Sequence, residues 1–119
     1  NMIAYCFSSK EGYSKFGSYT GNGSSDGPFV YTGLRPAFLI VKDASGADNW
    51  RLYDNKRIGF NANNYSLYPN LQNAEDSVTD HVDFLSNGFK LRSSNNNSSS
   101  RTYIYMAFAE QPFKYSNAR

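Results

Sequence analysis

Apolar and polar residues alternate along most of this chain, in short runs that turn-forming residues interrupt about every ten positions. Alternation with a period of two is typical of strands that bury one face, and no stretch keeps the 3.6-residue period of a long helix. The pattern therefore predicts an all-β protein. The expected strands lie near residues 2–8, 13–20, 28–32, 37–43, 49–54, 65–68, 81–85, 88–93 and 102–110.

The same alternation assigns the faces of the strands. Val82 and Phe84 alternate with polar neighbours, which predicts one buried and one solvated face. The segment 38–41 is apolar on both faces and is expected to be a central strand, and 103–109 resembles it. Strands covered on both sides predict an antiparallel β-sandwich, lectin-like or jelly-roll in character, or a sheet that also meets a neighbour.

Turn-forming residues predict two hairpins, within residues 36–53 and 82–92. In the second hairpin, Asn87 and Gly88 both tolerate a positive φ, so a tight primed turn is expected there. Three segments are expected to be loops: 21–27 as a flexible connection, 55–80 as a long polar excursion, and 93–100 as an exposed tip, because the last is a serine and asparagine tract.

Composition narrows the class of protein further. The 119 residues are 39% hydrophobic, 17% aromatic and 18% charged, with a formal net charge of +2. Strong helix formers are sparse, which argues against a coiled coil, a helical bundle, a membrane span and a disordered tail. The small net charge argues against a nucleic-acid partner. The lack of a long apolar run argues against insertion into a membrane. The lone Cys6 excludes an intrachain disulfide.

The two ends of the chain resemble each other. Residues 3–8 (IAYCFS) align with residues 104–109 (IYMAFA). Either this is a chance similarity between two aromatic strands, or the chain belongs to a tandem array with a period of about 100 residues. The array hypothesis makes residues 1–10 the final strand of a preceding repeat and residues 11–119 a single β-sandwich domain.

Several longer strings resemble a repeated domain of tailed-bacteriophage virion proteins. They are EGYSKFGSYTGNG at residues 11–23, DGPFV at 26–30, GLRPAFLIVK at 33–42, LSNGFKLR at 85–92, YIYMAFAE at 103–110 and PFKYSNAR at 112–119. The resemblance covers nearly the whole chain except the loop 55–80. It implies a structural protein of the phage tail or tail fibre with a lectin-like β-sandwich. It supplies no ligand and no catalytic residues.

Catalytic and metal-binding patterns are weak. The densest acidic stretch, Glu75, Asp76, Asp80, His81 and Asp83, matches no standard calcium loop and is expected to be a solvated charged loop. The group Asp43, Asp48 and Asp54 is a second weak cation candidate. A zinc site is not expected, because the chain has one histidine and one distant cysteine as ligands. No motif supports a catalytic triad or a pair of glycosidase carboxylates, so the sequence predicts no catalytic residues, no metal and no cofactor.

A group of aromatic and polar residues in the middle of the chain is the candidate binding site. Sugar rings stack on aromatic faces while amides and guanidinium groups bond their hydroxyls, and rigid aromatics lose little entropy on binding. The alternative is that Trp50, which alternates with Leu52, belongs to the core. The candidate ligand-binding residues are Trp50, Arg51, Tyr53, Asn55, Asn63, Asn64, Tyr65 and Tyr68, with Asn49 nearby.

The preferred function is therefore that of a non-catalytic domain of a phage tail or tail fibre, made in the bacterial cytoplasm and assembled into the virion. It would contact other virion subunits, form a homo-oligomer, and attach to a bacterial surface glycan or act as a spacer. A polysaccharide depolymerase is the alternative from the enzyme class. A purely architectural virion subunit is the third hypothesis.

Overall fold

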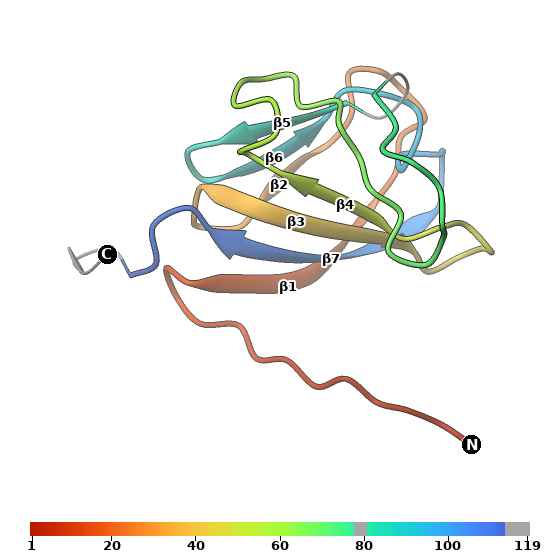
Figure 1. The fold of residues 1–119 in the computed structure, drawn as a ribbon, viewed down its shortest axis with the longest axis horizontal. Coiled ribbons are helices and arrows are strands. Elements are labelled where there is room, and N and C mark those ends of the chain that lie inside the picture. Colours follow the sequence, from red (N-terminus) through yellow and green to blue (C-terminus); the bar gives the residue numbers. More distant parts are fainter. Residues whose placement is uncertain (78–80, 114–119) are drawn as a thin grey trace.

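The computed structural model describes residues 1–77 and 81–113, which form two stacked antiparallel sheets (Figure 1). One sheet has the strand order β1-β7-β3-β4, and the other has the order β2-β6-β5. The antiparallel β-sandwich predicted from the sequence is confirmed. The strands are β1 (Ser14–Thr20), β2 (Phe29–Tyr31), β3 (Pro36–Asp43), β4 (Arg51–Asp54), β5 (Val82–Leu85), β6 (Gly88–Leu91) and β7 (Thr102–Ala109).

The core lies between the two sheets and is unusually aromatic. Tyr19 of β1 stacks on Tyr103 of β7 with ring centroids 5.2 Å apart. Tyr105, two residues further along β7, meets Phe89 of β6 edge-on at 5.2 Å. Alternation puts every second residue of a strand into this layer, so the core comprises Tyr19, Val30, Leu39, Val41, Tyr53, Val82, Phe84, Phe89, Leu91, Tyr103, Tyr105 and Ala107.

The predicted faces and the predicted central strand are confirmed. Val82 and Phe84 are buried while the intervening Asp83 is half-buried. β3 lies between β7 and β4, as expected from the apolar character of residues 38–41. Because the inward residues of β7 fill the core, its alternate apolar residues, Ile104 among them, lie on the outer face of the four-stranded sheet. This sheet therefore has two apolar faces.

The second hairpin forms, but its turn differs from the prediction. β5 and β6 pair with Leu85 opposite Gly88, and neither Asn87 nor Gly88 adopts a positive φ. The primed-turn prediction is therefore wrong. Gly88 is required for a different reason, because a Cβ there would lie 2.1 Å from the carbonyl oxygen of Val30 on the neighbouring strand β2. The glycine permits close strand contact rather than an unusual backbone angle.

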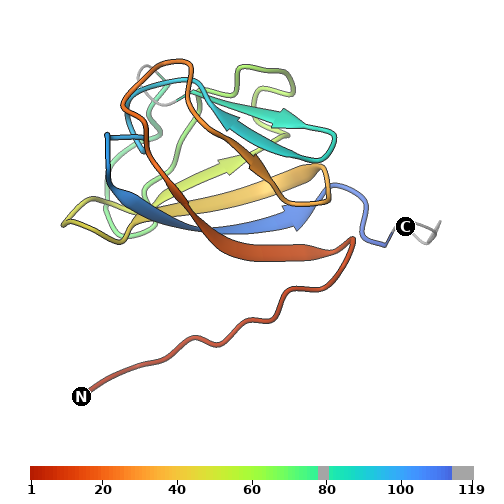
Figure 2. The same ribbon diagram turned by 180° about the vertical axis from the view of Figure 1, so that it is seen from behind.

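Two predicted strands are absent. Residues 1–9 form an extended arm that leaves the sandwich beside β1 (Figures 1 and 2), and residues 2–8 are not part of either sheet. Residues 65–68 make only isolated bridges, in which Leu52 and Leu67 exchange backbone hydrogen bonds of 2.9 and 3.0 Å. Alternation identified both segments as extended, but a strand also needs a partner along its length.

The loops 21–27 and 93–100 are more ordered than the sequence suggested. Asn96 and Asn97 are buried, and the Asn97 side chain accepts from the Asn22 amide at 2.9 Å and donates to the Ser24 carbonyl at 2.7 Å. The serine and asparagine tract is therefore not an exposed tip throughout, because the Asn97 amide bonds the backbone of the glycine-rich loop and the Asn96 amide donates to the Tyr53 hydroxyl. That loop is held in place rather than left as a flexible connection.

Candidate functional site

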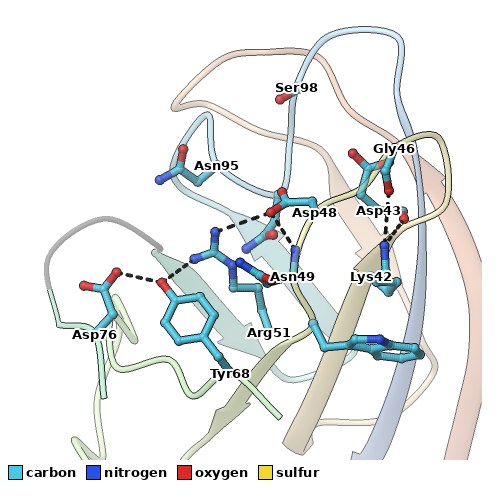
Figure 3. A network of polar contacts seen from close by, with 12 residues as sticks. Lys42, Asp43, Gly46, Asp48, Asn49, Arg51, Tyr68, Asp76, Asn95 and Ser98 are labelled. Atoms are coloured by element: carbon cyan, nitrogen blue, oxygen red, sulfur yellow. Dashed lines mark hydrogen bonds and ion pairs between the residues drawn. The ribbon is translucent and has the colours of Figure 1, made fainter. Parts of the chain in front are cut away.

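Arg51 is the centre of a polar network at the end of the sandwich that carries the β3–β4 loop (Figure 3). Its Nη1 donates to the Tyr68 hydroxyl at 2.8 Å, and the guanidinium carbon lies 4.6 Å from the centroid of the Tyr68 ring. The other terminal nitrogen lies 4.0 Å from Asp48 Oδ1. The Tyr68 hydroxyl in turn donates to Asp76 Oδ2 at 2.9 Å. Charge-assisted bonds of this kind hold the loop after β4 against the strand.

Backbone contacts explain why these distant residues meet. The bridge between Leu52 and Leu67 aligns the loop with β4, which brings Tyr68 beside Arg51. The amide of Trp50 donates to Asn70 Oδ1 at 3.0 Å, and Asn70 Nδ2 donates to Asn49 Oδ1 at 3.0 Å. The network is therefore held by the Leu52–Leu67 bridge on one side and by the bonds of Asn70 on the other. The Arg51 side chain is only 11% exposed, so its main role here is to stabilise the loop.

A second ion pair joins the base of the β3–β4 loop to the loop before β7. Arg101 Nη1 lies 2.6 Å from Asp43 Oδ2, and the Ser45 amide donates to Asp43 Oδ1 at 2.7 Å. Burial raises the pKa of Asp43, but the bonds from Arg101 and Ser45 outweigh it, and the net pKa lies below the ordinary value. Lys42 caps the same loop by donating to the carbonyls of Asp43 and Gly46 (Figure 3). The charged groups at this end of the sandwich are thus bonded to one another and to loop carbonyls.

Two of the predicted ligand residues lie inside the protein. Tyr53 is fully buried, and its hydroxyl accepts from Asn96 Nδ2 at 2.8 Å. Burial raises the pKa of Tyr53 well above its usual value. Asn63 is also buried; it donates to the carbonyl of Asp54, and its Oδ1 accepts from the Tyr65 amide at 3.2 Å. Both residues support the fold, and neither is within reach of a ligand in this structure.

The remaining predicted residues do not converge. Trp50 lines an apolar hollow of about 580 Å³ on the outer face of the four-stranded sheet. Asn64 donates to the Ser77 carbonyl at 2.6 Å in the loop after β4, and Tyr65 beside it is half-buried. Asn55 lies towards the opposite end of β4 from Arg51, where its Nδ2 donates to Glu110 Oε1 at 2.9 Å. Sequence proximity therefore did not translate into a single site.

A groove that sequence reasoning missed lies at that opposite end. Two hollows of about 510 and 290 Å³ share the lining residues Glu11, Gly12, Tyr31 and Gly33. Together they form what we call the Tyr31 groove, after the ring of Tyr31, which is 65% exposed. The larger hollow is also lined by Leu34, Arg35, Glu110 and Gln111.

Two charged groups of the Tyr31 groove, Arg35 and Glu110, are bonded to each other. Arg35 Nε lies 2.8 Å from Glu110 Oε2, while Asn55 bonds the other oxygen of the same carboxylate. Gly33, with a φ of 74°, turns the chain after β2, and its amide donates to the Asn87 carbonyl at 3.2 Å. The contributing residues are nearly 100 positions apart in the sequence, so no local pattern could have predicted the groove.

The acidic residues are distributed among separate ion pairs. Glu75 and Asp54 both bond Arg57, and Asp83 lies 3.3 Å from Arg92. Asp80 lies outside the described residues. Within residues 1–77 and 81–113, no three histidine, cysteine, aspartate or glutamate side chains are grouped as metal ligands. Over the same ranges, no helix has the length and apolar character needed to cross a membrane.

Comparison with known proteins identifies the family of this chain. Residues 1–112 match the family described as Domain of unknown function (DUF7483), and the chain belongs to it. No curated protein and no solved structure matches the chain.

Proposed function

We propose that this domain is a non-catalytic attachment domain of a tailed-phage virion and that it binds a bacterial surface saccharide in the Tyr31 groove. The observation that carries the proposal is the Tyr31 ring, which is 65% exposed within a concave site that also presents a guanidinium, carboxylates and an amide. Concave sites with a few fixed polar groups are typical of small-ligand binding. A tyrosine ring offers a rigid apolar plane at low entropic cost, which suits a sugar ring.

Arg35 and Glu110 of the groove favour binding because they are bonded to each other before a ligand arrives. Glu110 is fixed by Arg35 on one oxygen and by Asn55 on the other. A guanidinium has five N–H donors and a carboxylate has several lone pairs, so both keep capacity for sugar hydroxyls. Groups that are already ordered lose less entropy when they bind.

The virion assignment is supported by the resemblance of the long strings of this sequence to phage tail proteins. Attachment by such a domain does not need a strong single site. Several copies in a homo-oligomer would raise avidity by about two to four powers of ten on a repetitive surface glycan. A groove of modest affinity, repeated across virion subunits, suits a surface that carries the same sugar many times.

The proposal is tested by binding of the purified domain to an array of bacterial lipopolysaccharides and capsular polysaccharides. We expect binding to at least one saccharide and at least tenfold weaker binding by Tyr31→Ala, equivalent to about 1.4 kcal/mol. Phe29→Ala is the matched control, because Phe29 is an exposed aromatic of the same strand that lines neither hollow. Equal loss in both variants, or no binding to any saccharide, would contradict the proposal, and the second result would favour a purely architectural subunit.

A polysaccharide depolymerase is the second candidate, and one observation favours it. Glu11 and Glu110 line the same hollow, and glycoside hydrolysis uses two carboxyl groups that face each other across the substrate. Incubation with each bound polysaccharide and an assay for new reducing ends separates the two functions. Turnover that is lost in both Glu11→Gln and Glu110→Gln would establish the enzyme, whereas binding without new ends supports attachment alone.

A further inference from the structure

The extended arm, residues 1–9, carries apolar side chains that the sandwich leaves in solvent. Met2 is 99% exposed, and Ile3 and Tyr5 are each 81% exposed. Phe7 is better covered, because its ring stacks on Phe16 of β1 with a centroid distance of 5.2 Å. Neighbouring apolar residues exposed in this way are typical of surfaces that a partner covers.

The edge of β1 is a surface of the kind that accepts an added strand. β1 is the outermost strand of its sheet, and in the described part of the chain no strand lies on its far edge. At the start of this edge, Ser14 exchanges backbone hydrogen bonds with Lys10, and the Phe16 amide donates to Ser9 Oγ at 3.1 Å. Beyond Phe16 the edge presents backbone donors and acceptors for another strand. Beside it, the apolar hollow of about 580 Å³ is lined by Phe16, Trp50 and Met106 of the sheet face and by Tyr5 and Phe7 of the arm.

The arm has the sequence of a strand that already pairs with β1. Residues 3–8 align with residues 104–109 of β7, and this alignment places Phe7 at the position of Phe108. The Phe16 ring lies 5.8 Å from Phe108 on one side and 5.2 Å from Phe7 on the other. The side chains of the arm therefore suit the second edge of β1 as those of β7 suit the first.

Within one copy, the turn before β1 sets the wrong register for this pairing. Lys10 and Ser14 form an isolated antiparallel bridge. Continued along the arm, that bridge would place Ser8 opposite Phe16, and Phe7 would point away from the outer face on which Phe16 lies. A shift of one residue moves every side chain of a strand to the other face. Within one copy the arm therefore does not pair with β1: Phe7 reaches Phe16 without strand pairing, and Met2, Ile3 and Tyr5 stay largely exposed.

We propose that residues 2–8 of one copy of this domain pair antiparallel with the far edge of β1 in a second copy. The incoming strand replaces the bonds that Ser9 and Lys10 of the second copy make to Phe16 and Ser14. A strand from another copy is free of the turn and can adopt the register that β7 uses, in which Phe16 lies opposite Met106. Through the alignment, Tyr5 takes the place of Met106. The arm then extends the sheet by one strand and covers the apolar hollow, and the second copy loses the exposed edge of its β1.

Disulfide cross-linking tests the register. β7 places Ala107 opposite Lys15, and Cys6 aligns with Ala107, so Cys6 of one copy should lie opposite Lys15 of another. A tagged copy carrying Cys6→Ser and Lys15→Cys is mixed with the untagged protein under mild oxidation. Any mixed disulfide then joins two copies, since Cys6 is the only native cysteine. We expect a tagged–untagged dimer on a non-reducing gel.

Ser18 provides the matched control for this experiment. Continuing the bridge of the chain's own turn would place Cys6 opposite Ser18, which is exposed like Lys15. With Cys6→Ser and Ser18→Cys in the tagged copy, we expect at least tenfold less mixed dimer. Equal or greater yield from the Ser18 variant, or no mixed dimer from either variant, would overturn the proposal. So would an intrachain disulfide in a Ser18→Cys variant that retains Cys6, because the arm would then close on its own β1.

Sedimentation velocity tests the association itself. Ile3→Asp combined with Tyr5→Asp should weaken self-association at least tenfold without changing the circular dichroism spectrum, because neither side chain is buried within one copy. Phe60→Asp is the control, since Phe60 is also largely exposed but lies in the loop after β4. An unaltered protein that stays monomeric at about 1 mM, or equal weakening by the control, would refute the pairing.

Discussion

Asn97 joins two loops that the strands alone would leave unconnected, and its removal should cost a large part of the stability. The side chain is fully buried. It accepts from the Asn22 amide at 2.9 Å and donates to the Ser24 carbonyl at 2.7 Å and to Asn22 Oδ1 at 2.8 Å. Asn97→Ala removes these three hydrogen bonds and a longer one to the Ser93 carbonyl at 3.3 Å, while leaving the backbone of its loop unchanged.

The expected loss of stability follows from these hydrogen bonds. Each intramolecular hydrogen bond contributes about 0.5–1.5 kcal/mol, and a buried group left without its partner costs more. Asn97→Ala should therefore lower the free energy of unfolding by about 2–4 kcal/mol. A domain of this size has only about 5–15 kcal/mol in total. With a urea dependence of about 2 kcal/mol per molar, the midpoint should fall by about 1–2 M.

Urea unfolding followed by the fluorescence of Trp50, the single tryptophan, measures this change. Asn73→Ala is the matched control, because Asn73 is exposed, and it should shift the free energy of unfolding by less than about 0.5 kcal/mol. A free energy for Asn97→Ala within the same margin of the unaltered protein would refute the reasoning. The loops would then be held by backbone bonds, which join Gly21 to Ser100 and Arg101 and Gly23 to the Asn97 carbonyl.

Two further predictions concern backbone contact and acid stability. Gly88→Ala should lower the free energy of unfolding by about 3 kcal/mol or more in calorimetry, because its Cβ would meet the Val30 carbonyl. Gly59→Ala, with open space around it but a φ of 78°, should lower it by about 1 kcal/mol, and equal losses in the two variants would contradict this. Because the pKa of Asp43 is lower in the folded protein than in the unfolded chain, its carboxylate stabilises the fold in full above about pH 4, and this stabilisation is lost as the pH falls through the lowered pKa. Asp43→Asn should therefore destabilise at pH 7, and the difference from the unaltered protein should shrink in acid; a constant difference in urea titrations at both pH values would contradict the ion pair with Arg101.

Local alternation predicted the fold class and the faces of most strands correctly, because each depends on neighbours two residues apart. Val82 and Phe84 face inward as their polar neighbours required, and residues 38–41 form a central strand. The same signal failed for residues 2–8 and 65–68. Alternation reports a side-chain pattern, whereas a strand needs a second segment at the correct distance and register.

The functional surfaces were less predictable than the strands. Tyr53 and Asn63 are residue types common in sugar sites, but both are buried. Tyr53 faces the core from β4, and Asn63 of the loop after β4 forms a bridge with Val82 of β5. Tyr31 carried no local signal, since its partners in the groove include Glu11 and Glu110, close to the two ends of the described chain. Which aromatic residues remain exposed is decided by how the sheets and loops cover one another.

The order of apolar and polar residues thus determined that this chain forms antiparallel strands, which side chains enter the core, and that the outer face of β7 is apolar. Tertiary structure decided which strands are neighbours, which loops are held by Asn97, and where charged groups meet the ring of Tyr31. The physical reason is range: strand periodicity is set by adjacent residues, whereas grooves and strand edges arise from contacts between segments far apart along the chain.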